Sequence, residues 1–349
     1  MKICFIIPSM TGGGAERVTA NLANRLDETG HEVTIMMTAS DEVDYKLNES
    51  VVLFKMGDRT NGSLTGRIQR ITAMRRYFRK NKDTAYVSME TATNMFAILS
   101  SLFMPINLII SERSNPKQYE HQKLRDCIYC FAKKMVFQTE DAKKCFSKRL
   151  QKDGKIIGNP VTEDNAVVYQ GERDKRFVAV GRLEAVKNYQ MLINAFANVV
   201  RMYPEYTLHF YGKGSLESDL REIVHSLDIT EKVYFEGFCQ NVQEKIKDAT
   251  AYILSSDYEG MSNSLLEAMS IGMPVISTDC PIGGSRMLIE HEKNGLLVPV
   301  GDVDALTEAM RYMIENPTTA MIMGREAAKV NERFSIQNIA NEWLQYIKE

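Results

Sequence analysis

Short apolar runs alternate with longer segments of helical period along the whole chain of 349 residues. In segments such as 15–28 and 64–80, apolar positions repeat every three or four residues, which is the period of an amphipathic helix. Strands that alternate with helices are typical of βαβ units, whose strands form a parallel sheet covered on both faces. We therefore predict strands over 3–7, 32–37, 51–54, 85–88, 107–111 and 134–138 in the first half of the chain.

A turn-forming sequence at Gly158-Asn159-Pro160 ends this series, and a second series follows it. The second series predicts strands over 176–180, 206–211, 232–235, 251–255, 274–277 and 296–298. Helices are predicted between them over 189–202, 216–226, 242–248 and 264–271, and three further helices close the chain.

The two series predict two doubly wound α/β domains, 1–159 and 160–332, with a terminal helical segment, 333–349, that returns towards the first domain. In such folds the ligand binds beyond the carboxyl ends of the strands. We therefore expect the ligand in a cleft between the two domains.

The composition is that of an ordinary globular protein, with 44% hydrophobic and 25% charged residues. It excludes a disordered chain, a fibrous repeat and a small disulfide scaffold, and no apolar run reaches the roughly 18–20 residues of a membrane span. The first apolar run ends at Pro8 and leads into glycines and Glu16-Arg17 in place of a cleavage site, so we expect a cytoplasmic protein. Six scattered cysteines agree with a reducing compartment.

The net charge of −2 conceals an asymmetry between the two halves. Residues 1–159 hold 25 Lys and Arg against 17 Asp and Glu, whereas residues 160–349 hold 18 against 28. The basic first half should therefore meet an anionic partner.

Much of this positive charge lies in the segment 59–82, which has eight Lys and Arg and no Asp or Glu. Its apolar residues predict one helical face, formed by Leu64, Ile68, Ile71, Met74 and Phe78. The other face carries the arginines that we assign to the acceptor side, Arg70, Arg75, Arg76 and Arg79. Because anionic lipids attract basic residues by roughly 1 kcal/mol each, we expect this face to meet a membrane leaflet or a lipid-linked diphosphate. The alternative is a solvated outer helix, and no nucleic-acid partner is expected because aromatic residues are sparse.

Gly12-Gly13-Gly14 follows the first predicted strand and opens the first helix. Glycines let the backbone approach a phosphate or a sugar, and the helix N-terminus adds unpaired N–H groups. A plain strand-to-helix turn is the alternative. A dinucleotide site is disfavoured because the GxGxxG spacing is incomplete and Thr38-Ala39-Ser40, without an acid, ends the second strand.

In the second half, Arg182 and Lys187 flank a strand-to-helix loop. The fork of Arg grips two phosphate oxygens and Lys adds a compact positive charge, so the two could neutralise a leaving diphosphate without a metal. The alternative is a solvated basic loop. Glu259 and Glu267 lie on either side of a predicted helix start, where N–H groups can bind a phosphate or a sugar hydroxyl. Ser264 and Glu267 also fit a capping box.

The segment 279–286 is another Gly-rich loop after a predicted strand, and it should face the same cleft. Tyr211-Gly212-Lys213-Gly214 is a lone GxG that we interpret as an ordinary strand-to-helix turn. The five histidines show no metal-ligand spacing, and the sequence contains neither a P-loop nor a GxSxG elbow.

Taken in order, these motifs resemble the retaining family 4 glycosyltransferases of the GT-B fold. The resemblance covers essentially the whole chain and rests on residues 12–17, 181–187 and 259–269, together with Asn159-Pro160 and 294–298. It implies an enzyme that moves a hexose or N-acetylhexosamine from a UDP-sugar to a growing cell-surface or lipid-linked glycan, at the inner face of the cell membrane. It also implies that no metal or cofactor is needed and that the leaving diphosphate accepts the proton of the attacking acceptor.

The resemblance further implies roles for single residues. Glu259 would contact the hydroxyls of the donor sugar, while Arg182 and Lys187 would bind its diphosphate. The other donor-binding residues would be Gly13 and Gly14 near the diphosphate, Gly237 and Phe238 at the uracil, Ser262, Asn263, Ser264 and Leu265 around the phosphates, Glu267 at the ribose, and Gly283 and Gly284 at the sugar.

The chain departs from the family pattern in two places. Relatives often carry His in the loop where Arg113 stands here, and an Arg would not act as a base near neutral pH, which leaves Glu112 as the candidate substitute. Many relatives have Glu where Met287 follows the Gly-rich loop. Two other functions stay open, namely a nucleotide-sugar epimerase that needs no acceptor and a catalytically silent nucleotide-sugar-binding subunit.

Overall fold

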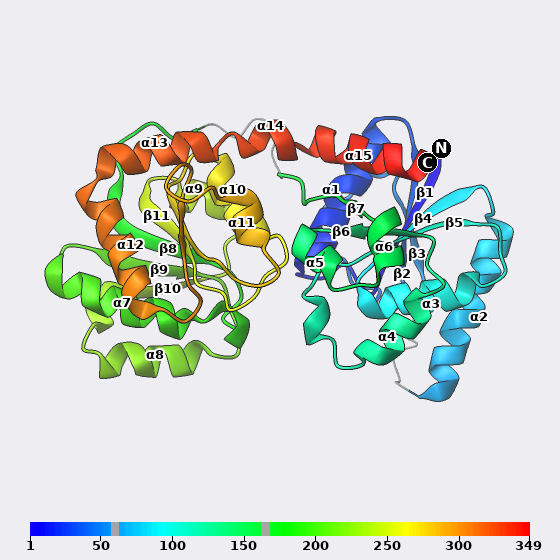
Figure 1. The fold of residues 1–349 in the computed structure, drawn as a ribbon, viewed down its shortest axis with the longest axis horizontal. Coiled ribbons are helices and arrows are strands. Elements are labelled where there is room, and N and C mark those ends of the chain that lie inside the picture. The colour runs from blue at the N-terminus through cyan, green and yellow to red at the C-terminus, as the bar shows by residue number, and fades with distance from the viewer. Residues whose placement is uncertain (57–62, 162–167) are drawn as a thin grey trace. The chain divides into compact units, whose positions relative to one another are not determined.

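The computed structural model describes residues 1–56, 63–161 and 168–349. The chain forms two compact units: unit 1 comprises Met1–Thr162 with Phe334–Glu349, and unit 2 comprises Glu163–Arg333 (Figure 1). Each unit is built around one parallel sheet, which confirms the predicted pair of doubly wound α/β domains. Arg59, the first residue of the basic segment, lies outside the described residues.

Unit 1 contains a seven-stranded sheet of order β3-β2-β1-β4-β5-β6-β7. Its central strands are buried almost throughout, as expected for a parallel sheet with helices on both faces. The strands are β1 (Lys2–Ile7), β2 (Glu32–Met37), β3 (Val52–Lys55), β4 (Thr84–Met89), β5 (Asn107–Ser111), β6 (Lys134–Phe137) and β7 (Lys155–Ile156). The two-residue β7 was not predicted, because so short a pairing leaves no pattern in the sequence.

Two layers of helices cover this sheet. Helices α2, α3 and α4 pack in succession, and Met74 and Phe78 of α2 contact Cys4, Ile6 and Tyr86 of the sheet. Helix α1 packs against α15 in the other layer (Figure 1). The helices of unit 1 are α1 (Gly14–Glu28), α2 (Leu64–Lys80), α3 (Thr91–Ser101), α4 (Gln122–Tyr129), α5 (Glu140–Lys144), α6 (Lys148–Asp153) and α15 (Ile336–Lys348).

Unit 2 contains a six-stranded sheet of order β10-β9-β8-β11-β12-β13, the doubly wound order 3-2-1-4-5-6. Helix α7 packs against α8 and α12, and α10 packs against α13. The strands are β8 (Asp174–Val180), β9 (Thr207–Tyr211), β10 (Val233–Gly237), β11 (Ala249–Leu254), β12 (Val275–Thr278) and β13 (Leu296–Val298). The helices are α7 (Tyr189–Met202), α8 (Glu217–Ser226), α9 (Val242–Ile246), α10 (Asn263–Ser270), α11 (Gly284–Leu288), α12 (Val303–Glu315), α13 (Pro317–Ala327) and α14 (Val330–Phe334). Four helices follow β13, so the prediction of three was wrong. Helix α12 ends at Asn316, and a separate helix, α13, begins with Pro317 as its first residue.

The last helix, α15, completes unit 1. Its Trp343 is fully buried, and the Tyr346 hydroxyl donates a hydrogen bond to the carbonyl oxygen of Asp153 at 2.7 Å. Asn107 at the start of β5 donates its side-chain amide to the carbonyl oxygen of Ile347 at 2.7 Å. The core of unit 1 therefore uses residues from both ends of the sequence.

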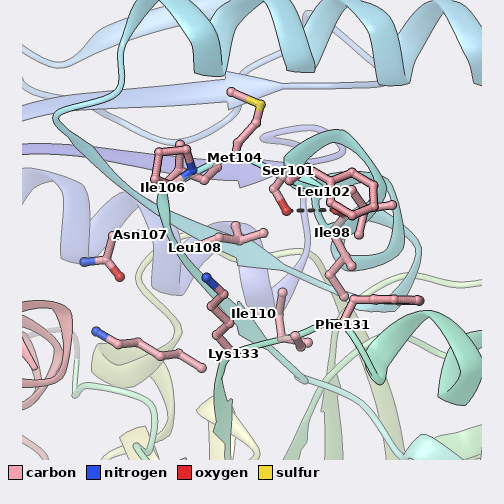
Figure 2. A pocket seen from close by; sticks show the side chains of 14 residues that line it. Ile98, Ser101, Leu102, Met104, Ile106, Asn107, Leu108, Ile110, Phe131 and Lys133 are labelled. Atoms are coloured by element: carbon pink, nitrogen blue, oxygen red, sulfur yellow. Dashed lines mark hydrogen bonds between the residues drawn. The ribbon is translucent and has the colours of Figure 1, made fainter.

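A cavity of about 710 Å³ lies in unit 1 at the amino-terminal ends of β5 and β6. Figure 2 shows apolar side chains such as Ile98, Leu108 and Phe131 around it, with Lys133 among the residues that line it. This edge is opposite to the one at which doubly wound sheets bind their ligands. The cavity is therefore separate from the candidate site described below. Within the described ranges, no helix is long and apolar enough to cross a membrane.

We expect Trp343→Ala to destabilise the protein by about 3–5 kcal/mol, because it empties a fully buried indole site in unit 1. Urea unfolding followed by far-UV circular dichroism measures the change. Phe103→Ala is the control, since Phe103 is 96% exposed and its removal should change stability by less than about 0.5 kcal/mol. An unchanged unfolding midpoint in the Trp343 variant would contradict the described packing of α15.

Candidate functional site

Three loops of unit 2 converge at the carboxyl ends of neighbouring strands. They follow β8, β11 and β12, which lie side by side in the sheet. The amide of Asp257 donates to the carbonyl oxygen of Val186 at 2.9 Å, and the amide of Glu259 donates to that of Pro281 at 3.0 Å. Backbone hydrogen bonds therefore join the loop that carries Lys187, the loop that carries Glu259 and the loop that leads to Gly283.

Lys187 and Glu259, both predicted to be catalytic, form an ion pair in which Nζ lies 2.5 Å from Oε1. The Ser256 hydroxyl donates to the same carboxylate oxygen at 2.9 Å. The two side chains are only 14% and 18% exposed, so their charges are partly withdrawn from water and depend on each other. An ammonium has three donors, and the pair with Glu259 uses one of them. Lys187 can therefore hold Glu259 and still bind a phosphate oxygen.

Arg182 lies on the rim of a cavity of about 410 Å³ in unit 2. Phe238 lines the same cavity and is 71% exposed. It follows Gly237, the last residue of β10, whose φ of +72° favours glycine. The structure thus brings together the residue predicted to bind a diphosphate and the residue predicted to read a base.

The helix that follows the Glu259 loop starts differently from the prediction. Ser262 is the N-cap of α10, and its hydroxyl accepts from the amide of Leu265 at 3.4 Å. The Ser264 hydroxyl instead pairs with that of Tyr252 at 2.8 Å, so the capping box of Ser264 and Glu267 is not formed. Glu267 is only 4% exposed and lies in the body of the helix.

Gly283 and Gly284 start α11 beside the Glu259 loop. A Cβ on Gly284 would come within 1.6 Å of the carbonyl oxygen of Gly260, so only glycine allows this approach. The predicted donor-sugar residues are therefore adjacent to the predicted catalytic loop.

In unit 1, the glycine segment after β1 is a tight turn into α1. Gly13 is the N-cap, and the Glu16 carboxylate folds over it, so that a Cβ on Gly13 would lie 2.0 Å from Oε2. Tyr45 donates its hydroxyl to the carbonyl oxygen of Gly13 at 2.7 Å. Gly14 is the first residue of the helix. This segment lies at the carboxyl edge of its sheet, where a doubly wound domain binds ligands.

Glu112 and Arg113 follow β5 and are more enclosed than the sequence indicated. Glu112 is 1% exposed, and its carboxylate accepts hydrogen bonds from Thr91, Asn94 and Tyr129. Burial raises the pKa of its carboxyl. Arg113 donates from Nη1 to Oδ1 of Asn159 at 2.8 Å and stacks over Trp343. The expected acceptor-side role of Glu112 therefore conflicts with its position, because no substrate hydroxyl could reach it without opening the core of unit 1.

Glu90 is a partly exposed carboxylate that the sequence analysis missed. It follows β4, and its φ of 73° and ψ of 148° are a conformation that essentially only glycine adopts without strain. Burial, together with the nearby Glu16 and Glu112, raises the pKa of its carboxyl to about 7. No sequence signal marks this residue, because both the backbone strain and the neighbouring carboxylates arise from the fold.

Lys213 is a second residue that was missed. It lies in the Gly-Lys-Gly turn that we interpreted as an ordinary connection, and it lines the cavity with Arg182 and Phe238. The glycines on either side were the available signal. A Cβ on Gly212 would meet the carbonyl oxygen of Gly181 at 1.9 Å, so the turn is pressed against the loop that carries Arg182.

The basic helix α2 differs from the predicted two-faced pattern. Leu64 and Ile68 are 74% and 53% exposed, so the apolar face is buried only in its second half, at Met74 and Phe78. Arg75 donates from Nη1 to the carbonyl oxygens of Ser100 and Leu102. Arg70 stacks over Phe96, and burial lowers its pKa. Arg70 and Arg75 are thus partly engaged within unit 1, whereas Arg67, Arg76, Arg79 and Lys80 are exposed.

Among the residues that the structure describes, no three His, Cys, Asp or Glu side chains lie close enough to hold a metal ion.

Glu90→Gln should change the pH dependence of stability. The ionised carboxylate is disfavoured in the folded protein, so the contribution of Glu90 is complete below pH about 4.5 and is lost as the pH rises through about 7. At pH 8 the Gln variant should therefore be more stable than the wild type by as much as about 3 kcal/mol, and the difference should vanish near pH 4.5. Urea unfolding at pH 4.5, 6 and 8 measures it, with the exposed Glu49→Gln as the control. A stability difference that does not vary with pH would refute this environment for Glu90.

Comparison with known proteins adds three observations. The family model described as Glycosyl transferases group 1 matches residues 162–330, which is nearly the whole of unit 2. The chain is 28% identical over its full length to a Campylobacter jejuni protein, covering 99% of it. That protein is named GalNAc-alpha-(1->4)-GalNAc-alpha-(1->3)-diNAcBac-PP-undecaprenol alpha-1,4-N-acetyl-D-galactosaminyltransferase. The present chain is also 25% identical to the lipopolysaccharide 1,6-galactosyltransferase of Salmonella typhimurium, over 87% of each of the two chains.

Solved structures agree in fold along the whole chain. The structure titled Anabaena Alr3699/HepE in complex with UDP and glucose superposes with a TM-score of 0.86 at 17% identity, covering 100% of both chains. The lipopolysaccharide outer core galactosyltransferase WaaB superposes with a TM-score of 0.81 at 22% identity, covering 100% of this chain and 99% of the other. The two doubly wound units thus have the GT-B fold, and residues 162–330 match the family of the group 1 glycosyl transferases.

Proposed function

We propose that this glycosyltransferase moves a hexose or N-acetylhexosamine from a UDP-sugar to a glycan on a polyprenyl diphosphate, with retention of the anomeric configuration and without a metal. The donor half of the proposal rests on the ion pair of Lys187 and Glu259. This pair lies on hydrogen-bonded loops at the carboxyl ends of the strands, and Arg182 belongs to one of these loops. The acceptor half is supported by the name of the Campylobacter relative, which acts on an undecaprenyl-diphosphate-linked glycan. The names of the relatives make GalNAc and galactose the first sugars to test.

In this proposal the chemistry depends on electrostatic stabilisation of the departing diphosphate. Preorganised charges act most strongly where water is excluded, and the Lys187 ammonium is already fixed and only 14% exposed before the donor binds. Arg182 grips further phosphate oxygens with its fork. Glu259 orients Lys187 and accepts hydrogen bonds from the hydroxyls of the donor sugar. The leaving phosphate takes the proton of the attacking acceptor hydroxyl.

The other residues assigned to donor binding lie around the loops that carry Lys187 and Glu259. Phe238 and Gly237 line or adjoin the cavity that takes the base, and Gly283 and Gly284 lie beside the sugar. Ser262, Asn263, Ser264 and Leu265 form the start of α10 near the phosphates, and the buried Glu267 serves the ribose. In unit 1, Gly13 and Gly14 at the start of α1 are the glycines at which the backbone can approach a phosphate. The amide of Leu265 binds the Ser262 hydroxyl, so the amides that precede it are the better phosphate donors.

For the acceptor side we assign the role of the accessible carboxylate to Glu90 instead of Glu112. Arg113 serves to position Asn159, the residue before Pro160, and does not contact the substrate. The exposed residues of α2 remain the surface for an anionic partner. Leu64, Arg67 and Ile68 expose apolar and basic side chains together at its start, as membrane-surface helices do, which supports a location at the inner face of the cell membrane.

We expect Lys187→Met and Glu259→Gln each to reduce transfer by roughly 10²–10³, because each removes a contact to the charged transition state or to the donor sugar. The two variants should differ in nucleotide binding. Lys187→Met should weaken UDP binding, whereas Glu259→Gln should leave it close to wild type, since Glu259 faces the sugar. Transfer is measured with radiolabelled UDP-GalNAc and UDP-Gal on a polyprenyl-diphosphate glycan, and UDP binding by calorimetry in EDTA.

Wild-type transfer rates in both variants would refute the site assignment. A wild-type enzyme that epimerises UDP-sugar without acceptor would favour the epimerase, and one that binds UDP-sugar but transfers to no acceptor would favour a silent binding subunit. Lys293→Met is the control for Lys187→Met and should leave both transfer and UDP binding unchanged, because Lys293 is an exposed lysine of unit 2 that pairs with Glu290.

Replacing Arg76, Arg79 and Lys80 together by Gln should weaken binding to anionic liposomes by roughly 100-fold, since each basic residue contributes about 1 kcal/mol near such a surface. The midpoint of thermal unfolding and UDP affinity should not change, because these side chains are exposed in α2. Liposome co-sedimentation measures binding. A triple variant in unit 2, with Lys232, Lys293 and Lys329 replaced by Gln, controls for net charge. Equal loss in both triple variants would show that total charge, and not α2, attracts the membrane.

A further inference from the structure

The cavity beside Arg182 contains a cation for which the proposed catalytic chemistry has no use. Lys213 and Arg182 both line it, together with Tyr211, Phe238 and Val242. Lys213 is exposed, and within the described parts of the chain no carboxylate pairs with its ammonium. Glu184, an acid in the loop that carries Arg182, accepts from the Ser215 hydroxyl at 3.2 Å.

The backbone of Lys213 is held in place while its side chain stays free. The amide of Gly212 donates to the carbonyl oxygen of Gly237 at 2.8 Å, and the carbonyl oxygen of Lys213 accepts from the amide of Leu183 at 3.0 Å. A Cβ on Gly214 would lie 2.3 Å from the carbonyl oxygen of Leu183, so only glycine lets this turn pack so closely on the loop it contacts. The position of Lys213 is therefore fixed by two neighbouring strand ends.

The side chain runs towards the aromatic part of the cavity. Its Cε lies 3.8 Å from the position of a Cβ on Gly237, the residue before Phe238. Phe238, at 71% exposure, offers a ring face on which a base can stack. The ammonium of Lys213 is thus placed at the edge of the space that a stacked base would fill.

A lysine can recognise only hydrogen-bond acceptors, because its ammonium has three donors and no lone pair. Uracil and guanine present a carbonyl oxygen at the position where cytosine and adenine present an amino group, which donates. A lysine at this edge of the base therefore favours uracil and guanine, whose carbonyl oxygen accepts a hydrogen bond from it. It disfavours cytosine and adenine, whose amino group is itself a donor. Arg182, on the same cavity, is assigned to the diphosphate, which every nucleotide shares.

We propose that Lys213 is a specificity-determining residue of the donor site, where it selects nucleotides whose base carries a carbonyl group over those whose base carries an amino group at the same position. The proposal rests on the nucleotide-sugar function proposed above and deepens it. It explains why a free cation lies in a mainly apolar cavity, and it gives the Gly-Lys-Gly turn a purpose beyond connecting β9 to α8.

The test is calorimetric titration of the full chain with UDP and CDP, which have rings of the same size. The wild type should bind UDP at least about tenfold more tightly than CDP, as expected for one hydrogen bond from a charged donor. Lys213→Met should bring the two affinities within about threefold of each other. Lys213→Glu should favour CDP, because a carboxylate accepts from the amino group, and Lys213→Arg should keep the preference for UDP.

Two controls keep the result specific. Lys175→Met removes an exposed lysine at the start of β8 that pairs with Glu205 at 3.2 Å, and it should leave both affinities unchanged. Thermal unfolding of each variant shows whether the fold is intact. If Lys213→Met weakens UDP and CDP equally, the lysine serves the diphosphate and the proposal is wrong. If the ratio of the two affinities stays at its wild-type value, the proposal is also wrong. If the wild type binds no nucleoside diphosphate, it is the nucleotide-sugar function itself that fails.

Discussion

Backbone atoms of different loops touch in unit 2 at places where no side chain would fit. Gly284 packs against the carbonyl oxygen of Gly260, and Gly212 packs against that of Gly181. The first contact joins the loops after β11 and β12, and the second joins the loops after β8 and β9. The hydrogen bond from the amide of Asp257 to the carbonyl oxygen of Val186 joins the two pairs into one surface. The positions of Arg182, Lys187, Glu259 and Lys213 all depend on it, because each residue belongs to one of the joined loops.

On this surface the charges are arranged for an anion. Lys187 is neutralised by Glu259 when no ligand is bound, which limits the cost of keeping an ammonium partly out of water. Arg182 and Lys213 are exposed and line one cavity. The carboxyl edge of the sheet in unit 1 is different, because Glu16, Glu90 and Glu112 lie near one another and the pKa of Glu90 is raised to about 7. The two sheets share a strand order, yet their functional edges carry opposite charge. The strand order of a sheet therefore does not by itself determine the charge of the ligand that its carboxyl edge can bind.

Much of the architecture was predictable because both sheets are parallel and buried, and such strands appear in the sequence as apolar runs between helical segments. Twelve strands were placed within two residues of their bounds, and the two-residue β7 was missed. Arg182 and Lys187 could be proposed for the donor site because they lie five residues apart in one loop and both residue types bind phosphates. The burial of Glu112 was not predicted because its partners Thr91, Asn94 and Tyr129 are distant in sequence. Glu90 and Lys213 were missed for a similar reason, since their importance comes from neighbours that only the folded chain brings together.

The closure of unit 1 by α15 has a consequence for synthesis on the ribosome. Unit 2 is one continuous stretch, whereas unit 1 needs Trp343 and Tyr346 from beyond it. At typical translation speeds, roughly ten to forty seconds separate the emergence of residue 162 from that of α15. During that interval unit 2 is synthesised in full, while unit 1 still lacks the helix that packs on α1. The domain made first is thus finished last, and the nascent first domain displays an uncovered apolar face that chaperones can recognise.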